Sequence, residues 1–385
     1  MAIILVSGAL ANKYRNGGEA WTRMSWVLGL QKLGFEVYFI EQIAPENCVD
    51  AAGNSTTFER SANLAYFEQI TKEFGLTGSA ALLESRTGQS RGLSLAQLLD
   101  LARDAALLVN ISGHLTFEPL LQKIQRKAYI DLDPGFTQFW HADAALNFRV
   151  APHDDYFTVG ENIGTEHCAI PTSGIPWRPI RQPVVLEHWP VMQSESLARF
   201  TTIASWRGPF GPVQYHNKTF GLKVHEFRKF IELPAHVPQR CEIALQIHPA
   251  DHRDLEALQR NSWQIVDPAL AATPTEFRRY LQDSDAEFSV AQGIYVETKS
   301  GWFSDRTVRY LASGKPVLVQ DTGVRHNLPV GAGLLTFSNF AEAVAGAQQL
   351  AADYALHCQA ARKLAEDFFD SNKVLRKLLE EVGIG

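Results

Sequence analysis

The sequence predicts an α/β protein built from two doubly wound units of similar size. Continuous apolar runs rich in β-branched residues alternate with helical patterns along both halves of the chain, as in parallel sheets that are covered on both faces. The length of 385 residues exceeds what a single core usually holds. A proline-rich stretch, residues 175–190, lies between the halves and favours an extended connection.

The first unit begins with a strand, a glycine-containing loop, a helix and a second strand. Residues 3–6 form the first apolar run, and residues 7–18 form the loop, which ends in Gly17 and Gly18. A helix with apolar residues at helical spacing follows, and residues 37–40 form the next strand. This order predicts one βαβ unit of a doubly wound sheet. We expect Gly17 and Gly18 to let backbone approach a phosphate or an acceptor, although glycine pairs are also common in ordinary loops.

Similar apolar runs continue along the chain. The further strands predicted in the two halves are residues 105–111, 127–130, 156–159, 200–204, 242–247, 263–266 and 316–319. The domain boundaries that we expect are residues 1–180, a linker at 181–195, residues 196–365 and a final segment at 366–385.

Composition and charge exclude several classes of protein. The formal net charge is −6, and no run of Lys or Arg with interleaved aromatic residues indicates a nucleic-acid partner. No stretch approaches the roughly 20 apolar residues of a transmembrane helix, and no basic residue precedes the first apolar run as in a signal peptide. The four cysteines are scattered, without a Cys-x-x-Cys pair. We therefore expect a cytoplasmic protein without a metal site.

The ends of the parallel strands indicate where ligands bind, because ligands of open α/β sheets lie beyond the carboxyl ends of the strands. His114 follows the strand at 105–111, and Asp131 follows the strand at 127–130. Either side chain could accept a proton from an acceptor hydroxyl, whereas a histidine at such a position can also be structural. Asp133 is an alternative base, but Asp133 also belongs to a sequence typical of a turn.

Residues 300–323 form the most informative segment. A glycine loop leads to Ser304, a good N-cap, and a helix follows that ends at Gly314. The free backbone N–H groups at such a helix start suit a phosphate. Asp305 in the first turn would repel a phosphate placed beside it, and could instead satisfy the helix dipole or accept hydrogen bonds from sugar hydroxyls.

This segment resembles the donor-binding region of GT-B glycosyltransferases, whose glycine loop and A-S-G-K-P-V stretch match Gly301 and residues 312–317. Over most of its length the chain also resembles bacterial glycosyltransferase-like proteins of undefined substrate. The resemblance implies a GT-B fold, in which two Rossmann-like doubly wound domains face each other across a cleft. It also implies that the final helix crosses back onto the first domain.

The resemblance implies roles for individual residues. Those expected at the donor diphosphate are Gly301, Trp302, Phe303 and Ser304, and those expected at the sugar are Asp321, Thr322 and Gly323. Arg207 and Lys223 match the cations that neutralise the leaving diphosphate, although both could be ordinary surface cations. His114 resembles a histidine that relatives place near the donor sugar.

One position departs from the family pattern. Retaining members carry two glutamates in this region, and the second grips the donor ribose. Gly301 and Arg309 stand in those two places, and an arginine cannot accept hydrogen bonds from ribose hydroxyls. The nucleotide must therefore be held differently. Arg309 can contact the donor, or it can pair with Asp305 one turn earlier on an exposed helix face.

The function that we expect is transfer of a hexosyl group from a nucleotide-diphosphate sugar to an unknown small-molecule or glycan acceptor, without a metal cofactor. Two alternatives stay open. One is a sugar-nucleotide epimerase of the same fold, and the other is a non-catalytic protein that binds a sugar or nucleotide on a GT-B scaffold.

Overall fold

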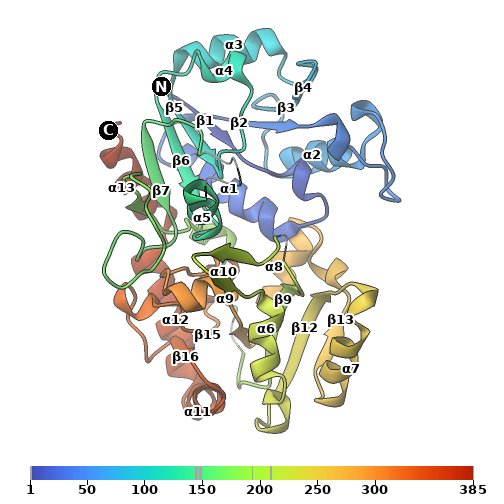
Figure 1. The fold of residues 1–385 in the computed structure, drawn as a ribbon, viewed down its shortest axis with the longest axis vertical. Helices are drawn as coiled ribbons and strands as arrows, with labels where there is room; N and C mark the ends of the chain where they lie inside the picture. The colour runs from blue at the N-terminus through green and yellow to red at the C-terminus, as the bar shows by residue number, and fades with distance from the viewer. Residues whose placement is uncertain (1, 144–145, 147–149, 193, 209, 385) are drawn as a thin grey trace.

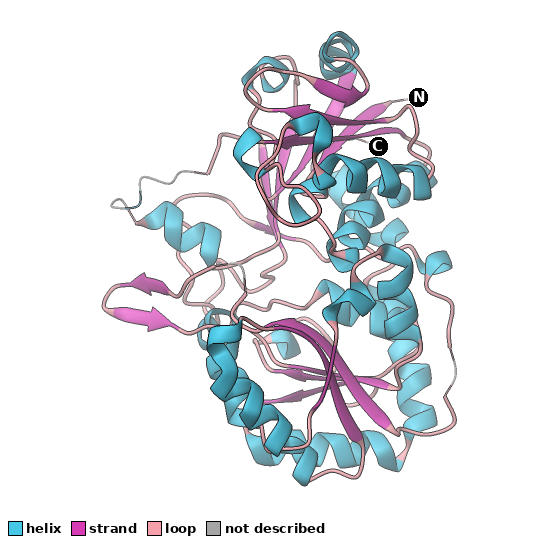
Figure 2. Cartoon of the chain, turned by 90° about the vertical axis from the view of Figure 1, so that its right-hand side faces the viewer, coloured by secondary structure: helices cyan, strands magenta, loops and turns pink. Residues whose placement is uncertain are grey.

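The computed structural model describes residues 2–143, 146, 150–192, 194–208 and 210–384. The described chain forms two sheets, one in each half, with helices on both faces (Figures 1 and 2). None of the described helices combines the length and the apolar character needed to cross a membrane.

The first sheet has eight strands in the order β4-β3-β2-β1-β5-β6-β7-β8, and every neighbouring pair is parallel except β3 and β4. The strands are β1 Ile3–Ser7, β2 Glu36–Ile43, β3 Ala80–Glu84, β4 Ser90–Gly92, β5 Ala105–Ile111, β6 Lys127–Asp131, β7 Asp155–Thr158 and β8 Arg178–Pro179. The α-helices of this half are α1 Gly17–Lys32, α2 Ala62–Glu73, α3 Leu95–Asp104, α4 Glu118–Leu121 and α5 Phe136–Ala142. Ile4 and Val6 pack under α1 and α2, whereas Leu5 packs under α3 on the opposite face.

The second sheet has six parallel strands in the order β13-β12-β9-β14-β15-β16, beside a hairpin of β10 and β11. The strands are β9 Arg199–Ser205, β10 Val213–Tyr215, β11 Lys218–Phe220, β12 Arg240–Gln246, β13 Gln264–Val266, β14 Ala286–Ser289, β15 Val317–Gln320 and β16 Leu334–Phe337. The α-helices are α6 Lys223–Phe227, α7 His252–Arg260, α8 Pro274–Gln282, α9 Gly293–Thr298, α10 Asp305–Ala312, α11 Phe340–Ala352, α12 Tyr354–Phe368 and α13 Ser371–Glu381.

Each predicted strand is present, with bounds that differ from the expected ones by at most three residues. The sequence did not indicate β3, β4, β8, β14, β16 or the hairpin. Between β5 and β6 the connection contains only a single helical turn, α4. The loop expected at residues 7–18 is too long, because α1 already begins at Gly17 with Asn16 as its N-cap.

The strand order reverses between β1 and β5 in the first sheet and between β9 and β14 in the second. Such reversals are where doubly wound sheets bind ligands, beyond the carboxyl ends of the strands. The loops after β1, β5 and β6 line a cavity that also includes residues from the start of α10 in the second half. The functional site is therefore to be sought between the two halves.

The chain ends on the half in which it began. Helix α13 lies against α1, where a Cβ atom on Gly29 would stand 2.4 Å from Leu375 (Figure 1). The segment before α13 forms a β-bridge through Val184 and Asp370. The crossing of the final helix, expected from the family resemblance, is thus seen directly in the packing of α13.

Helix α1 also packs directly on the second half. A Cβ atom on Gly17 would lie 2.2 Å from the carbonyl oxygen of Thr273, and one on Gly18 would lie 2.8 Å from the ring of Phe277. The indole Nε1 of Trp21 donates a hydrogen bond to the Pro274 carbonyl oxygen at 2.8 Å. Gly17 therefore admits backbone of the opposite half and Gly18 admits an aromatic ring of that half, at the place where the sequence had suggested a phosphate or an acceptor.

Candidate functional site between the two halves

A cleft of about 240 Å³ lies between the halves, next to the contact made by α1. The lining residues are Ala9, Lys13, Glu19, Thr22, Arg23, Ile111, Ser112, His114, Leu132, Asp133, Gln182, Trp302 and Asp305. Four residues singled out from the sequence are brought together here: His114, Asp133, Trp302 and Asp305. The cleft therefore combines a histidine, an aromatic ring and several charged groups.

His114 is neutral in this environment. Burial lowers the pKa of His114 to about 4, and the neighbouring charges of Arg23 and Lys13 act in the same direction. Its Nε2 lies 2.9 Å from the Gln42 carbonyl oxygen, an acceptor, so Nε2 carries the proton. Asn12 lies 3.4 Å from the same nitrogen but directs its amide hydrogens at Glu41 and Gln42. Nδ1 is therefore left as a hydrogen-bond acceptor.

The sequence suggested Asp131 as a base and Asp133 as a turn residue or an alternative base, but it is Asp133 that faces the cleft. Asp131 is 1% exposed, and its carboxylate accepts hydrogen bonds from Thr137, Gln138 and Thr158 at 3.1, 2.8 and 2.7 Å. It therefore holds the loop after β6 together behind the cleft wall. Asp133 lines the cleft, and burial raises the pKa of its carboxyl group, which is opposed by the charges of Lys13 and Arg23.

Two cations in the cleft were not singled out from the sequence. Arg23 forms an ion pair with Glu19 one turn earlier, yet its Nε is buried and has no hydrogen-bond partner. Lys13 makes no hydrogen bond or ion pair through its ammonium group within the described part of the chain. Burial lowers the pKa of both groups. A charged residue inside the apolar pattern of α1 was the one sequence signal that could have identified Arg23.

Asp305 and Arg309 connect α10 to the first half. Thr22 donates a hydrogen bond to Asp305 Oδ2 at 2.7 Å, and Arg309 Nη1 lies 3.1 Å from the same oxygen. Arg309 Nη2 also donates to Ser25 Oγ at 3.3 Å. The expected pair of Asp305 and Arg309 is present, but the face is buried where we expected it to be exposed, because Arg309 is only 1% accessible.

Lys223 begins α6 and stands near the start of α10. Burial lowers the pKa of Lys223 to about 7, the charge of Arg306 adds to this shift, and the carboxylates of Glu287 and Asp305 oppose it. Its backbone N–H is held by Gln292 Oε1 at 2.8 Å. Within the described residues the ammonium group makes no hydrogen bond or ion pair. A partly buried cation without a partner is the kind of group that a bound anion completes.

Arg207 is arranged differently. Its guanidinium makes a two-point pair with Asp251, in which Nε donates to Oδ2 at 2.9 Å. The side chain is 58% exposed, and like Lys223 it does not line the cleft. The two cations that the sequence analysis grouped together therefore differ, since Arg207 is occupied and Lys223 is not.

The loops expected to meet the donor are filled by a residue of the first half. Asn162 Nδ2 donates to the carbonyl oxygens of Lys299 and Gly323 at 2.8 and 3.1 Å. Gly301 and Gly323 have φ angles of +77° and +89°, and a Cβ atom on either would come within 2.9 Å of Asn162. Glycine is needed at both positions for the close approach of Asn162.

The other residues expected at the donor make contacts within the protein around α10 and the loop that follows β15. Ser304 caps α10 as predicted, through its hydroxyl oxygen and the Arg306 N–H at 3.3 Å. Phe303 is buried and stacks on Phe369. Thr322 donates to the Trp302 carbonyl oxygen at 2.6 Å. Asp321 is 7% exposed and lies 3.3 Å from Arg325 and 3.7 Å from Lys299.

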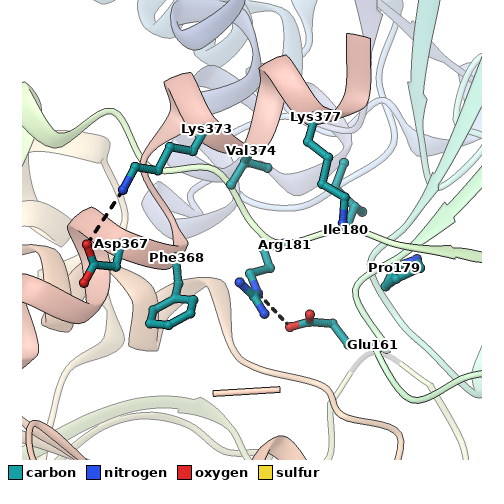
Figure 3. A pocket seen from close by; sticks show the side chains of 9 residues that line it. All are labelled: Glu161, Pro179, Ile180, Arg181, Asp367, Phe368, Lys373, Val374 and Lys377. Atoms are coloured by element: carbon teal, nitrogen blue, oxygen red, sulfur yellow. Dashed lines mark hydrogen bonds and ion pairs between the residues drawn. The ribbon is translucent and has the colours of Figure 1, made fainter. Parts of the chain in front are cut away.

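A separate cavity of about 170 Å³ lies where the connection between the halves crosses the C-terminal helices (Figure 3). Arg181 points between Glu161, which lies 3.0 Å from its Nε, and the Phe368 ring, whose centroid is 5.1 Å away. Lys373 reaches Asp367 at 3.7 Å. The charges at this junction are paired with one another, so we assign it to the joint between the halves.

In the part of the chain that the structure describes, no three His, Cys, Asp or Glu side chains gather as metal ligands would. No protein-family model matches the sequence, and no curated protein matches it.

The solved structures give many matches over the whole chain. An alpha-glucosyltransferase in complex with UDP has a TM-score of 0.61 at 11% identity, with both chains fully covered. Anabaena HepE in complex with UDP and glucose has a TM-score of 0.62 at 11% identity, again with full coverage of both chains. Sucrose-phosphate synthase from Thermosynechococcus elongatus has a TM-score of 0.56 at 13% identity, covering 100% of this chain and 99% of its own. The chain therefore has the GT-B fold, with two Rossmann-like domains facing each other across a cleft.

Proposed function

We propose that the protein transfers a hexosyl group from a nucleoside-diphosphate sugar to an acceptor hydroxyl. The donor lies against the second half, near Lys223 and α10, and the acceptor lies against the first half. The observation that carries this proposal is the unpartnered Lys223 ammonium beside the start of α10. Structures of the same fold that contain UDP support the choice of a nucleotide donor.

Lys223 and the helix start suit a leaving diphosphate. As the bond between the anomeric carbon and the phosphate oxygen breaks, the diphosphate gains negative charge. The Lys223 ammonium and the backbone N–H groups of α10 oppose that charge, and we propose that they do so in place of a metal ion. The Asp305 carboxylate, which would repel the phosphates, is partly neutralised by Arg309 and held by Thr22.

The acceptor hydroxyl attacks the anomeric carbon and loses its proton to a base on the first half. We assign this role to Asp133, in place of Asp131, because Asp133 lines the cleft and its raised pKa favours proton uptake. His114 is neutral, and its Nδ1 can accept a hydrogen bond from a sugar hydroxyl. Trp302 provides an apolar face for the ring.

The size of the cleft indicates a closed conformation. Ligand pockets typically have volumes of about 300–1,000 Å³, and the cleft has about 240 Å³. A nucleotide sugar therefore requires that the halves separate. The hydrogen bonds of Thr22 to Asp305 and of Asn162 to Gly323 would be exchanged for contacts with the donor.

A second candidate is a non-catalytic protein that binds a nucleotide or sugar on the same scaffold. One observation favours it, since Asn162 occupies the loops at Gly301 and Gly323. An asparagine that stays in place would exclude a donor sugar from that position. Both candidate functions require that a nucleotide or sugar binds, but only the first requires that the donor is turned over.

The test is a panel of nucleotide sugars assayed for hydrolysis and for transfer, with UDP binding measured by calorimetry in parallel. We expect turnover with at least one donor, unchanged by EDTA, and strongly reduced in Lys223→Ala and Asp133→Asn. Lys363→Ala is the control, since Lys363 is exposed on α12 and its ion pair is with the neighbouring surface residue Asp367. Binding without turnover would favour the second candidate. Neither binding nor turnover with any nucleotide would contradict both.

A further inference from the structure

A second and larger cavity, of about 560 Å³, lies outside the cleft. Its lining residues come from α2, from the short turn Pro268–Ala271, from the start of α8 and from the loop before α1. We call it the outer groove. Its lining includes Tyr14, Arg15, Arg60, Tyr66, Gln69 and Glu276. Its volume falls in the range of about 300–1,000 Å³ that is typical of ligand sites.

The outer groove adjoins the cleft. Lys13 lines the cleft, and the next two residues, Tyr14 and Arg15, line the outer groove. Consecutive residues of one loop therefore line the two cavities. Arg15 has a φ angle of +59°, a left-handed conformation that few residues other than glycine and asparagine adopt.

The charges of the outer groove favour an anion. Arg15 and Arg60 are exposed, and within the described residues neither side chain makes an ion pair or a hydrogen bond. The acidic residue in the lining, Glu276, accepts hydrogen bonds from the N–H and hydroxyl of Thr273 at 3.1 and 2.9 Å, as the capping box of α8. The arginines are thus left without a carboxylate, and guanidinium groups bind carboxylates and phosphates in a two-point geometry.

The remaining lining suits a ring with hydroxyl groups. The rings of Tyr14 and Tyr66 meet edge to face, with centroids 5.8 Å apart. Tyr14 is half-buried, and Gln69 adds an exposed amide. Aromatic walls with a few polar groups are typical of sites that bind cyclic polar ligands.

We propose that the outer groove binds the acceptor and that the acceptor is an acidic saccharide. Its carboxylate or phosphate pairs with Arg15 and Arg60, and a sugar ring packs against Tyr14. The hydroxyl that receives the hexosyl group extends past Lys13 into the cleft. This proposal rests on the proposed function only in naming the bound saccharide as the acceptor.

The test measures direct binding to the full chain by calorimetry. The acidic probe is hyaluronan tetrasaccharide, whose uronate rings carry carboxylates, and the neutral probe is chitotetraose. Glucose 6-phosphate, compared with glucose, tests a phosphate as the source of the anion. We expect the acidic member of at least one pair to bind at least about tenfold more tightly, since hydrogen bonds to charged groups are the stronger ones. The affinity should fall as salt is raised from 50 to 300 mM.

Variants then place the site. The double variant Arg15→Gln with Arg60→Gln should weaken binding of the acidic probe at least about tenfold. Arg103→Gln is the matched control, because Arg103 is an exposed arginine on α3, on the opposite face of the same sheet from α2, and this variant should bind as the unchanged protein does. Equal binding of acidic and neutral probes would overturn the proposal. Undiminished binding by the double variant, or displacement of the saccharide by UDP, would also overturn it.

The two proposals can fail separately. If the double variant loses the saccharide but no donor is ever turned over, the outer groove is an acidic-saccharide site and glycosyl transfer is wrong. If hexosyl transfer is found and the double variant binds and uses its acceptor as before, glycosyl transfer stands and the assignment of the outer groove is wrong.

Discussion

Two cations of the second half, the buried Arg309 in the contact with α1 and the partly buried Lys223 near the start of α10, differ in what surrounds them. Burial lowers the pKa of Arg309 to about 10, with Asp305 opposing the shift, and lowers that of Lys223 to about 7. Arg309 donates hydrogen bonds to Asp305 on its own helix and to Ser25 of α1 across the contact. Lys223 makes no side-chain bond among the residues described. A paired buried charge fits a structural contact, and an unpaired one indicates a site that a ligand completes.

Replacing Lys223 should have the largest effect. Lys223→Ala removes the cation that meets the leaving diphosphate, and loss of one such preorganised group lowers kcat by about 100-fold or more. Steady-state kinetics with the best donor of the panel measures this. Circular dichroism should show an unchanged fold, and a kcat within threefold of the unchanged protein would show that Lys223 does not serve the reaction.

Arg309→Ala should act on stability. Removing one partner of a buried pair costs about 3 kcal/mol, since Asp305 keeps its charge without its counter-ion. Urea denaturation measures the change in the free energy of unfolding. Lys363→Ala, which breaks an exposed pair, should change the free energy of unfolding much less. Equal losses in the two variants would mean that Arg309 does not support the contact.

Gly17→Ala tests the close approach of the halves. The added methyl group would overlap the Thr273 carbonyl oxygen, so overpacking should cost about 1–3 kcal/mol and push α1 away from the second half. Small-angle scattering should show a larger radius of gyration. Gly211→Ala is the control, since a Cβ atom there meets nothing within 4 Å. No change in either measurement would contradict the packed contact.

Of these effects, the change in the pH profile of kcat/KM close to pH 7 should be the smallest, and the direction of that change identifies the titrating group. The pKa of Lys223 is lowered from 10.5 to about 7, so its ammonium is lost as pH rises through about 7. The value of kcat/KM should fall about tenfold per pH unit above that point. Between pH 7 and 10.5 the unfolded chain binds the extra proton, so this group makes stability rise with pH. In Lys223→Arg the side chain keeps its charge over this pH range, so kcat/KM should no longer fall as pH rises. If kcat/KM of this variant still falls, another group is responsible for the pH dependence.

Much of the fold follows from short-range pattern. Strands such as β1 and β5 are apolar and β-branched, and the helix start at Ser304 is marked by its cap. Strand β14 was missed because it contains Glu287, which is buried only through its pairing with Arg306 at 2.6 Å. That pairing depends on the tertiary fold, so no local signal in the sequence reveals it.

The site was predicted less completely, because its contacts join the two halves. His114 and Asp305 were found through their places at strand and helix ends. Asn162 fills the loops at Gly301 and Gly323 from more than a hundred residues away in sequence, and no local pattern reveals such a contact. Arg23 was likewise hidden inside the apolar pattern of α1.

A crystal structure of the protein with UDP tests the central claim most directly. The account predicts that the halves open and that a diphosphate oxygen lies within about 3 Å of Lys223 Nζ, near the start of α10. UDP bound away from Lys223, or bound in the outer groove, would contradict it.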